Sequence, residues 1–438
     1  MEIAMYTRKI LICLLLITYA EVSAQNWELQ NSGTKATLRS ISFVDSLHGY
    51  VVGDSSTMLK TTNGGKNWLK LSMPKQSVIF RKVQFISKTV GFVVSSDGSL
   101  LSTTDSGLNW SVDIIMPDSS GFFHDDLCFI NENEGWMTGR KEGKNYGIGI
   151  IMHTTNGGKT WTKQLELKSY IQTDVKYFTS IKFINRETGW ALASDYFDNF
   201  SSTFLYRTDN GGINWNIVNV IKSIPVNDIK LINRDTLWIG GGSSAKFVKT
   251  FNGGTTLNYS FIDTIYASQI APQSGLQGWL SHRKPFNFSD YNKIMFTMDG
   301  GITWKEEYRI KETVLGMCTL NNYLWLVGTD GLILKRTPLK TSVKETQEIY
   351  SKQKIQLQNY PNPFNSTTQV NYQLPLSGFV TLKIYDLLGR EVTTLVNETQ
   401  PAGYYTIRFN GSSLPSGIYV YQLTSNNINI SKKMILMK

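Results

Sequence analysis

The chain has 438 residues, a formal net charge of +10, three cysteines and four histidines. No spacing of cysteine and histidine residues matches a metal site, so the sequence predicts neither a metal nor a cofactor. No basic run longer than a pair is interleaved with aromatic residues in a recognisable module, which argues against a nucleic-acid partner.

Residues 1–24 have the three parts of a secretory signal peptide. Arg8-Lys9 forms the charged start, residues 10–20 form the apolar core, and Val22-Ser23-Ala24 is the small-residue cleavage site. A membrane anchor is the alternative, but the apolar run is too short to span a bilayer. Cys13 lies inside the apolar core, which argues against a lipoprotein. We therefore expect no transmembrane segment after cleavage.

An eight-residue box recurs along the chain. Its clearest copy is Thr61-Thr62-Asn63-Gly64-Gly65-Lys66-Asn67-Trp68, and the copy at 250–257 lacks the tryptophan. The first threonines are 42, 51, 54, 42 and 47 residues apart. A period of this size indicates a repeat architecture. The six boxes begin at Thr61, Thr103, Thr154, Thr208, Thr250 and Thr297.

Short runs rich in β-branched and aromatic residues surround each box. In the first repeat they are 41–43, 49–53, 57–61 and 68–71. Four short strands per period are the content of one propeller blade. The pattern of the second strand occurs seven times, so the sequence predicts an all-β protein with a seven-bladed β-propeller.

The box is expected to form the hairpin between the third and fourth strands of its blade. Asn or Asp would bond the backbone two residues on, Gly would supply positive φ, and Trp would fold back against the neighbouring blade. Ligand binding by the box is the alternative, but a motif repeated around a ring is expected to be scaffold. The residues with this expected structural role are Asn63, Gly65, Trp68, Asp105, Gly107, Trp110, Asn156, Gly158, Trp161, Asn210, Gly212, Trp215, Asn252, Gly254, Asp299, Gly301 and Trp304.

The seventh blade has no box, because its third strand at 332–337 runs into Pro338. The segment 26–30 matches the pattern that follows the first box, so the N-terminal strand is predicted to complete this blade. Through these boxes and strands, residues 26–337 resemble the Asp-box (BNR) repeat propellers of the photosystem II assembly factor type, related in repeat chemistry to sialidases and sortilin. The boxes often carry Asn where those families prefer Asp. We assign residues 25–337 to this domain.

Residues 338–356 lack an apolar period and are predicted to be a linker. Strands and turn signals then alternate at about ten-residue spacing through 357–438, which favours a small, Ig-like β-sandwich. This segment closely resembles the type A C-terminal sorting domain of the type IX secretion system; an Ig-like accessory domain is the alternative. The motif residues are Pro361, Asn362, Pro363, Phe364, Gly389, Gly417, Tyr419, Lys432 and Lys433.

The sorting resemblance implies export by Sec, then passage across the outer membrane of a Gram-negative bacterium by the type IX machinery. It further implies a protein that is released or attached at the cell surface. For such a protein the net charge of +10 fits contact with acidic glycans or lipopolysaccharide, although scattered solvated lysines explain it equally well.

The mature chain keeps two cysteines, Cys128 and Cys318. They fall on the predicted inner strands of blades three and seven. Two separate buried thiols are expected rather than a disulfide.

Loop lengths point to one face of the propeller. The turns from first to second strand are nearly constant, whereas the second-to-third turns and the links between blades vary. Variable loops tend to carry function, and aromatic and charged residues there suit stacking on sugars or holding a peptide. The alternative is that these aromatic residues pack the loops onto the rim. The candidate ligand-binding residues in the insertions are Arg140, Tyr146, Tyr196, Phe197, Arg283, Phe286 and Tyr291.

The mouth of the central channel is a second candidate ligand site. The residues just before the inner strands include Arg39, Arg81, Asp125, Asp126 and Asp228. Arginines opposite carboxylates would hold a zwitterionic or acidic ligand, although rim electrostatics explain them as well.

Three functions compete. A non-catalytic binding or assembly propeller is favoured, because every strong motif is structural; its ligand would be a protein or glycan. A glycoside hydrolase would need two carboxylates across the channel, for which Asp126 and Asp228 are the candidates. A sialidase would need three arginines that converge on the axis. It is discounted, because Arg186 and Arg234 fall in short turns on the opposite face, and Arg207 and Arg336 occupy matching third-strand positions that look like blade surface. A surface adhesin is the third possibility, with Tyr196, Phe197 and Phe286 as its contacts.

Overall fold

The computed structural model describes residues 27–115, 122–143, 146–169, 176–195, 202–222, 226, 228–241, 246–261, 266–283, 291–338, 357–374, 378–400, 403–425 and 428–438. These residues form two compact units, one with strands β1–β28 and the other with β29–β35. The predicted signal peptide and residues 339–356 of the predicted linker lie outside the described residues.

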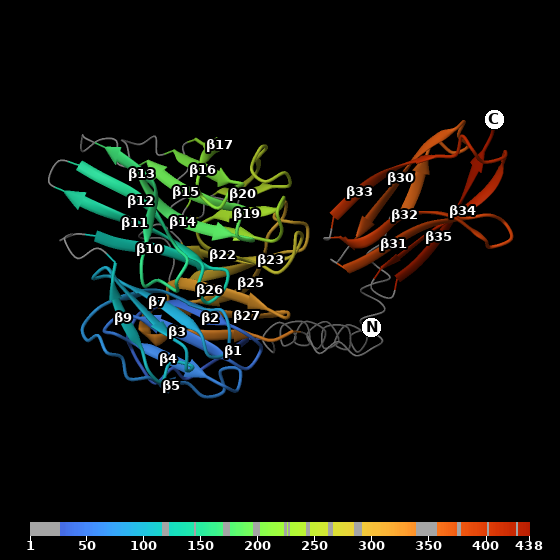
Figure 1. Cartoon of the computed structure of the whole chain (residues 1–438). Helices are drawn as coiled ribbons and strands as arrows, with labels where there is room; N and C mark the ends of the chain where they lie inside the picture. Colours follow the sequence, from blue (N-terminus) through green and yellow to red (C-terminus); the bar gives the residue numbers. More distant parts are fainter. Residues whose placement is uncertain are drawn as a thin grey trace, which may run out of the picture. The chain divides into compact units, whose positions relative to one another are not determined.

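Seven four-stranded antiparallel sheets build the first unit and follow one another around a ring (Figure 1). Blade one contains β2 (Leu38–Phe43), β3 (Gly49–Gly53), β4 (Met58–Thr61) and β5 (Leu69–Lys70). Blade two contains β6 (Phe80–Phe85), β7 (Gly91–Ser95), β8 (Ser99–Thr103) and β9 (Ser111–Ile114). Blade three contains β10 (Phe122–Phe129), β11 (Gly135–Gly143), β12 (Tyr146–Thr154) and β13 (Thr162–Ser169). Blade four contains β14 (Lys176–Phe183), β15 (Gly189–Asp195), β16 (Thr203–Thr208) and β17 (Asn216–Ile221).

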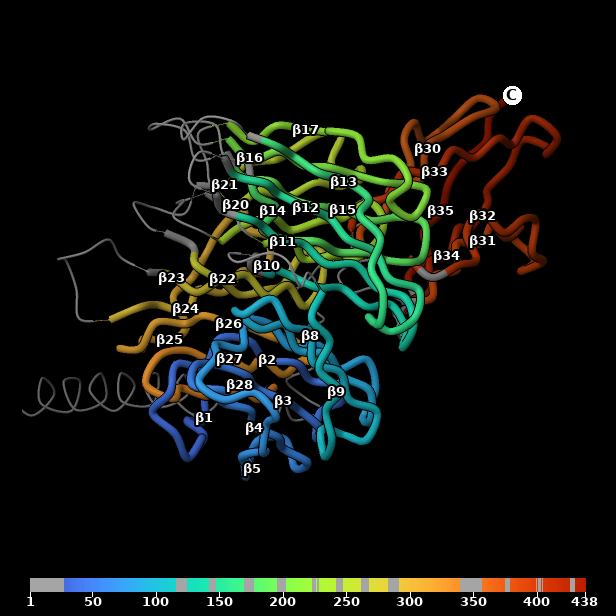
Figure 2. Tube along the Cα trace, turned by 60° about the vertical axis from the view of Figure 1, so that its left-hand side comes forward, coloured from blue at the N-terminus to red at the C-terminus, as the bar shows by residue number. Residues whose placement is uncertain are grey.

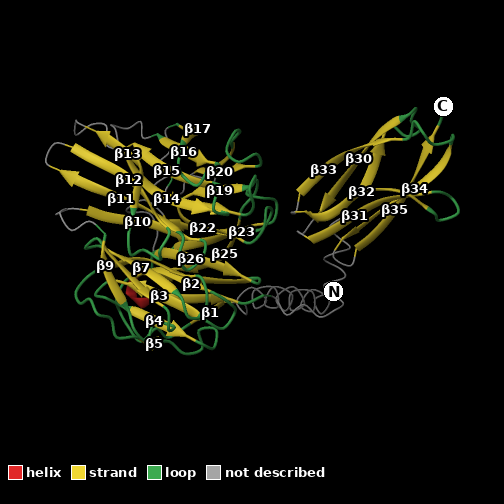
Figure 3. Ribbon diagram, viewed as in Figure 1, coloured by secondary structure: helices red, strands yellow, loops and turns green. Residues whose placement is uncertain are grey.

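The remaining three blades repeat the pattern. Blade five contains β18 (Asp228–Leu231), β19 (Leu237–Gly240), β20 (Lys246–Thr250) and β21 (Asn258–Phe261). Blade six contains β22 (Tyr266–Pro272), β23 (Gly278–Arg283), β24 (Asn292–Thr297) and β25 (Lys305–Ile310). Blade seven contains β26 (Val314–Leu320), β27 (Tyr323–Gly328), the 3₁₀ turn η1 (Thr329–Gly331), β28 (Ile333–Arg336) and β1 (Trp27–Leu29). The predicted all-β, seven-bladed fold is confirmed, and Figure 3 shows how completely strands dominate it.

The N-terminal strand closes the ring, as the sequence predicts. β1 pairs antiparallel with β28, placing Trp27 opposite Arg336 and Leu29 opposite Leu334. Figure 2 shows the two strands side by side. The third strand of blade seven therefore has a partner on both sides, which removes an edge open to aggregation.

Aromatic stacks join one blade to the next. Phe85, at the end of the first strand of blade two, stacks on Tyr50 of the second strand of blade one, with ring centroids 3.4 Å apart. Comparable stacks join Phe92 to Phe129 (3.6 Å), Trp136 to Phe183 (3.6 Å) and Trp325 to Phe43 (3.8 Å). Glycine opens the second strand because this ring covers it: a Cβ on Gly135 would lie 2.5 Å from Phe129.

The box forms a tight hairpin that its first threonine anchors. In blade three, the Thr154 hydroxyl accepts a hydrogen bond from Gly158 N (3.0 Å) and donates one to Asn156 Oδ1 (3.0 Å). Gly157 and Gly158 have φ of +71° and +90°, which glycine adopts without a Cβ clash. The expected bond from the Asn side chain to the backbone two residues on is wrong. Asn156 Oδ1 reaches four residues on, to Thr160 N (2.9 Å), because the glycine pair turns the chain back over the side chain.

The second unit has two sheets, ordered β29-β30-β33 and β32-β31-β34-β35. Its strands are β29 (Leu357–Tyr360), β30 (Thr367–Leu374), β31 (Gly378–Tyr385), β32 (Glu391–Gln400), β33 (Gly403–Asn410), β34 (Gly417–Ser425) and β35 (Ile428–Leu436). Apolar residues from both sheets share one buried core that includes Val370, Leu382, Tyr421 and Met434. A small β-sandwich results, as predicted.

Candidate functional site

The first strands of neighbouring blades contact one another in a closed cycle, which places them around the axis of the propeller. Side chains on these strands accept hydrogen bonds from the backbone of the next blade. These side-chain acceptors therefore link one inner strand to the inner strand of the next blade. Such bonds join Ser42 Oγ to Phe85 N (3.0 Å), Gln84 Oε1 to Phe129 N (2.8 Å) and Cys128 Sγ to Phe183 N (3.2 Å).

The two cysteines serve this inner network. Cys128 is buried and Cys318 is half-buried, and both are free. Cys318 holds the position equivalent to Cys128, with the backbone of Phe43 as its partner. Burial raises the pKa of both thiols, which favours unreactive hydrogen-bonding groups.

A β-bulge positions the predicted mouth residues. The register of the first strand shifts by one residue at Arg39, Arg81 and Asp125, so each is the extra residue of its strand. A bulge re-aims the side chain that it inserts. These three residues lie within strands β2, β6 and β10, rather than before them as the sequence suggested.

Three arginines and two carboxylates gather there. We call Arg39, Asp54, Arg81, Asp125 and Arg140 the mouth cluster. Asp54 accepts two hydrogen bonds from the Arg39 guanidinium, and Arg140 Nη1 lies 3.7 Å from Asp125 Oδ1. Burial lowers the pKa of Arg81. The negative charge of Asp125 opposes this shift, whereas the positive charges of Arg140 and Arg39 add to it. The cluster therefore holds one more positive than negative charge.

Aromatic support comes from blade four. The Arg140 guanidinium carbon lies 5.3 Å from the centre of the Tyr177 ring, within the range of a cation–π contact. Such a contact holds the plane of the guanidinium.

The candidate catalytic carboxylates are ion-paired. Asp126 is buried; it contacts Lys182, lies 3.2 Å from Lys82 Nζ and accepts a hydrogen bond from Ile181 N (3.1 Å). Although burial opposes the shift, the lysines hold the pKa of Asp126 below its usual range. Asp228 lies 3.0 Å from Lys230 Nζ. A glycosidase acid needs a raised pKa, so the surroundings of Asp126 suit a structural ion pair better.

The predicted loop contacts are only partly described. Tyr196, Phe197 and Phe286 lie outside the described residues. Tyr146 is the first residue of β12, and Arg283 is the last residue of β23. Tyr291 is 44% exposed, with Lys311 Nζ 5.8 Å from the centre of its ring. Arg140 thus joins the mouth cluster, while a role for the other loop residues stays a prediction.

The box residues serve the scaffold. In blades one to five the box turn hydrogen-bonds to the first-to-second-strand turn of its own blade, as Gly157 N does to Asn133 O (2.8 Å). Trp161 packs at right angles to Phe129 and donates to Gly158 O (2.9 Å). The glycine and tryptophan positions therefore stabilise hairpins and blade contacts.

Cations on third strands hold the box turn of the next blade. Lys335 Nζ donates to Gly64 O (2.8 Å) and Lys60 Nζ donates to Ser106 O (3.0 Å). The prediction that Arg207 and Arg336 match is wrong by one residue. Arg207 pairs with the second-strand Trp190, whereas the corresponding partner of Trp325 is Lys335.

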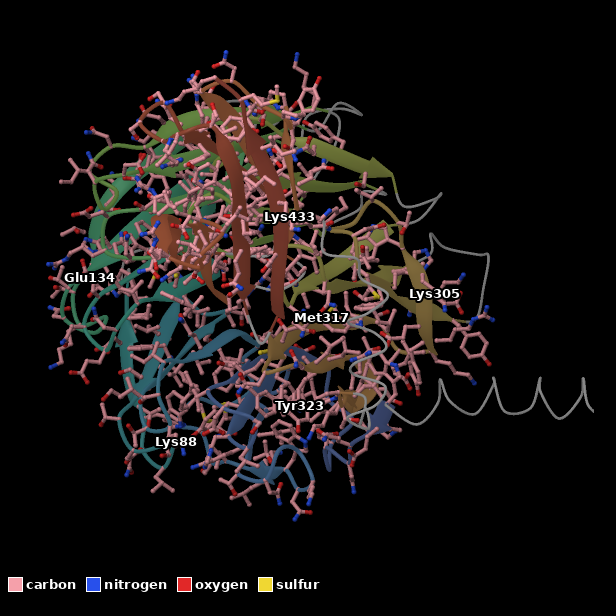
Figure 4. The ribbon with its side chains drawn as sticks, turned by 90° about the vertical axis from the view of Figure 1, so that its right-hand side faces the viewer. Lys88, Glu134, Lys305, Met317, Tyr323 and Lys433 are labelled. Carbon is pink, nitrogen blue, oxygen red and sulfur yellow. The ribbon has the colours of Figure 1, made fainter. Side chains whose placement is uncertain are left out.

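The face that carries the boxes has a hollow that the sequence did not indicate. It lies between blades three and four and has a volume of about 480 Å³. Its lining includes Glu134, His153 and Arg186. Arg186 Nε donates to Glu134 (3.1 Å), and His153 stacks on Trp136 with ring centroids 4.7 Å apart. Figure 4 labels Glu134 on the turn of blade three and Lys88 on the equivalent turn of blade two. Glu134 and His153 are 19 positions apart in sequence, and Arg186 follows His153 by 33 positions, so no local motif brings the three together.

The part of the chain that the structure describes contains neither a metal-binding cluster nor a helix that could span a membrane. Within it, no group of three His, Cys, Asp or Glu side chains is placed to hold a metal ion. No helix among the same residues is long and apolar enough to cross a membrane.

Seven four-stranded sheets define a seven-bladed BNR-repeat propeller, and six of them carry an Asn-Gly-Gly, Asp-Ser-Gly or Asp-Gly-Gly hairpin between their third and fourth strands. Residues 19–111 and 66–254 match the family model of the photosynthesis system II assembly factor YCF48, and the chain belongs to this family. Residues 358–437 match the secretion system C-terminal sorting domain. The sorting domain indicates export through the type IX system to the cell surface or beyond.

A curated relative is the photosystem II assembly lipoprotein Ycf48 of Synechococcus sp. strain CC9902. It is 23% identical over 235 residues, which are 54% of this chain and 52% of the relative. The chain therefore spans about half the length of that relative.

Solved structures show the same fold. YCF48 bound to a D1 peptide is 20% identical, with a TM-score of 0.55 over 72% of this chain and 97% of that one. YCF48 from Cyanidioschyzon merolae is 19% identical, with a TM-score of 0.56 over 72% and 99%. A streptogramin B lyase is 13% identical, with a TM-score of 0.50 over 72% and 98%.

Proposed function

We propose that the exported propeller is a non-catalytic binding module that holds an anionic group of its ligand at the mouth cluster. The gathering of Arg39, Arg81 and Arg140 around two carboxylates carries the proposal. Arginine presents a planar fork of donors that suits a carboxylate. The excess positive charge selects an acidic group, while Asp54 and Asp125 keep the guanidinium groups in place.

A peptide carboxylate is the ligand group that we favour. One family member has been solved with a peptide, and an extended peptide presents carboxylates at its acidic side chains and its C-terminus. The ion pairs of Asp126 give no support to a hydrolase.

The test is binding of the purified full chain to an array of acidic peptides, each with a free or an amidated C-terminus. Arg140→Gln should weaken binding of the acidic peptides at least tenfold, because a charge-assisted bidentate contact contributes more than about 1.4 kcal/mol. Binding should also weaken as salt concentration rises.

Arg234→Gln is the matched control, because Arg234 lies in a first-to-second-strand turn on the box face. Its binding should equal that of the unmodified protein. Equal peptide binding by Arg140→Gln and Arg81→Gln, both correctly folded, would refute the proposal.

A further inference from the structure

Exposed apolar side chains gather at one end of the four-stranded sheet in the second unit. Leu387, Leu388, Ile418 and Ile435 are 66%, 78%, 40% and 38% exposed. We call these four residues the apolar tip. Monomeric domains seldom expose several large apolar side chains together without a binding role.

The strand register brings the members of the tip to the same end. Ile418, near the start of β34, lies directly opposite Ile435 of β35. β31 ends at Tyr385, which lies opposite Val420, two residues from Ile418. The β31–β32 turn, with its two leucines, therefore leaves the sheet beside the Ile418–Ile435 pair.

The turn that carries the leucines is ordered by its own hydrogen bonds. Asp386 Oδ1 accepts from Leu388 N (2.9 Å) and from Arg390 N (3.0 Å). Arg390 Nε donates to Asp386 Oδ2 (2.7 Å), and Asp386 N donates to Arg390 O (3.0 Å). The leucines are thus held out in solvent by a defined turn, which lowers the entropy cost of contacting a partner.

The Pro-Asn-Pro-Phe motif covers the edge of β35 next to the tip. Ile435 N donates to Asn362 Oδ1 (2.9 Å), Phe364 N donates to Ile435 O (2.9 Å), and Met437 N donates to Phe364 O (2.9 Å). The backbone of β35 is therefore occupied at this point and cannot accept an added strand there. Contact at the tip must use side chains.

Positive charge borders the apolar tip. Lys433 is exposed and lies opposite Val420, in the row next to the Ile418–Ile435 pair; it is labelled on β35 in Figure 4. Arg390 is 75% exposed by side chain, although it is paired with Asp386. Lys432 and Lys438 are also exposed. The complementary surface is apolar at its centre and acidic at its rim.

We propose that the apolar tip is the surface by which the sorting domain docks on a protein of the export machinery. The match of residues 358–437 to a sorting domain supplies the class of partner, and the exposed leucines bordered by cations supply its chemistry. The Pro-Asn-Pro-Phe motif positions this surface by covering the edge of β35. The Lys432-Lys433 motif contributes to its basic border.

The experiment measures export of the full chain from a bacterium that has a type IX system. The variant Leu387→Ser/Leu388→Ser should lower the exported fraction at least tenfold, with the protein retained inside the outer membrane. Leu387→Met/Leu388→Met keeps the apolar chemistry and should export normally. The control is Phe379→Ser, at the opposite end of β31 and 56% exposed, which should also export normally.

Folding is checked by thermal unfolding of each purified variant, since substitutions at exposed positions change stability little. Ile418→Thr and Ile435→Thr test the tip from the sheet side and should each reduce export. Normal export of the double serine variant would overturn the proposal. It would also be overturned if the tip proved to hold another occupant. That outcome would be shown if the unmodified chain bound phosphatidylglycerol vesicles, or formed dimers, and the double serine variant did not.

Discussion

His124 is a residue whose ionisation the propeller suppresses. Its side chain is fully buried on β10, and Nε2 lies 2.9 Å from the carbonyl oxygen of Gly98. Burial lowers the pKa of His124 from 6.5 to about 4, although the Gly98 carbonyl opposes the shift. The imidazole is therefore neutral across the physiological range.

Stability should fall with acidity because of this histidine. Between pH 6.5 and about 4 the unfolded chain binds a proton that the folded chain does not, so the free energy of unfolding decreases as pH falls. A loss of about 2 kcal/mol is expected between pH 6.5 and pH 5. Burial also lowers the pKa of His153, which adds a change of the same sign.

Urea unfolding at a series of pH values measures this loss. His124→Gln keeps a side-chain donor and should flatten the pH dependence across this window. Parallel curves for the two proteins would show that His124 is not the source.

The sequence indicated some of the residues of the mouth cluster and of the box, but not all of them. Arg39 and Arg81 were found because they repeat at one position of successive blades. Asp54 was missed, because it follows β3 and reaches Arg39 only after the hairpin folds. The anchoring threonine of each box was also missed as a structural residue, although its presence in all six copies was a usable signal.

At the scale of strands and turns, the two kinds of tryptophan differ. Trp136 on β11 is fully buried, stacks on Phe183 and donates Nε1 to Gly211 O (3.2 Å) of the next blade. The box residue Trp161 is only half-buried and donates within its own turn. The second-strand position therefore holds two blades together.

We expect Trp136→Ala to destabilise the propeller by about 3–5 kcal/mol, the cost of a large cavity. Trp161→Ala should cost less, because part of its surface already contacts solvent. Chemical denaturation of the two variants compares them directly. An equal or larger loss for Trp161→Ala would contradict this ranking.

Strand periodicity and box spacing predicted these elements well, since each blade repeats one local pattern. The β-bulges at Arg39, Arg81 and Asp125 were not predictable in the same way. A bulge depends on which residues pair across strands, and the bulged position has no single residue type: Thr179, Ser268 and Leu315 occupy it in blades four, six and seven. The sequence could therefore place the mouth residues near the axis but not show which of them meet.

For the molecule as a whole, β1 decides whether the ring is closed. Its three residue pairs with β28 form the seam of blade seven, and Trp27 stacks on Tyr308 with centroids 5.0 Å apart. A chain that begins at residue 31 should unfold at lower temperature than one that begins at residue 25, and it should self-associate, because β28 then has an open edge. Calorimetry and light scattering measure both effects.

Glu28→Ala is the control, because Glu28 is exposed on β1 and leaves the backbone pairing intact. If the truncated chain stays monomeric and unfolds at the same temperature as the chain that begins at residue 25, the seam contributes little to the stability of the ring.

The partners in this seam, Trp27 and Arg336, stand 309 positions apart. A ribosome makes one of them near the start of synthesis and the other only after six blades have been translated. The N-terminal strand β1 therefore has no partner until β28 has been made. Closing so long a loop is slow in folding terms, so we expect the ring to be completed as a final step, after β28 has been made.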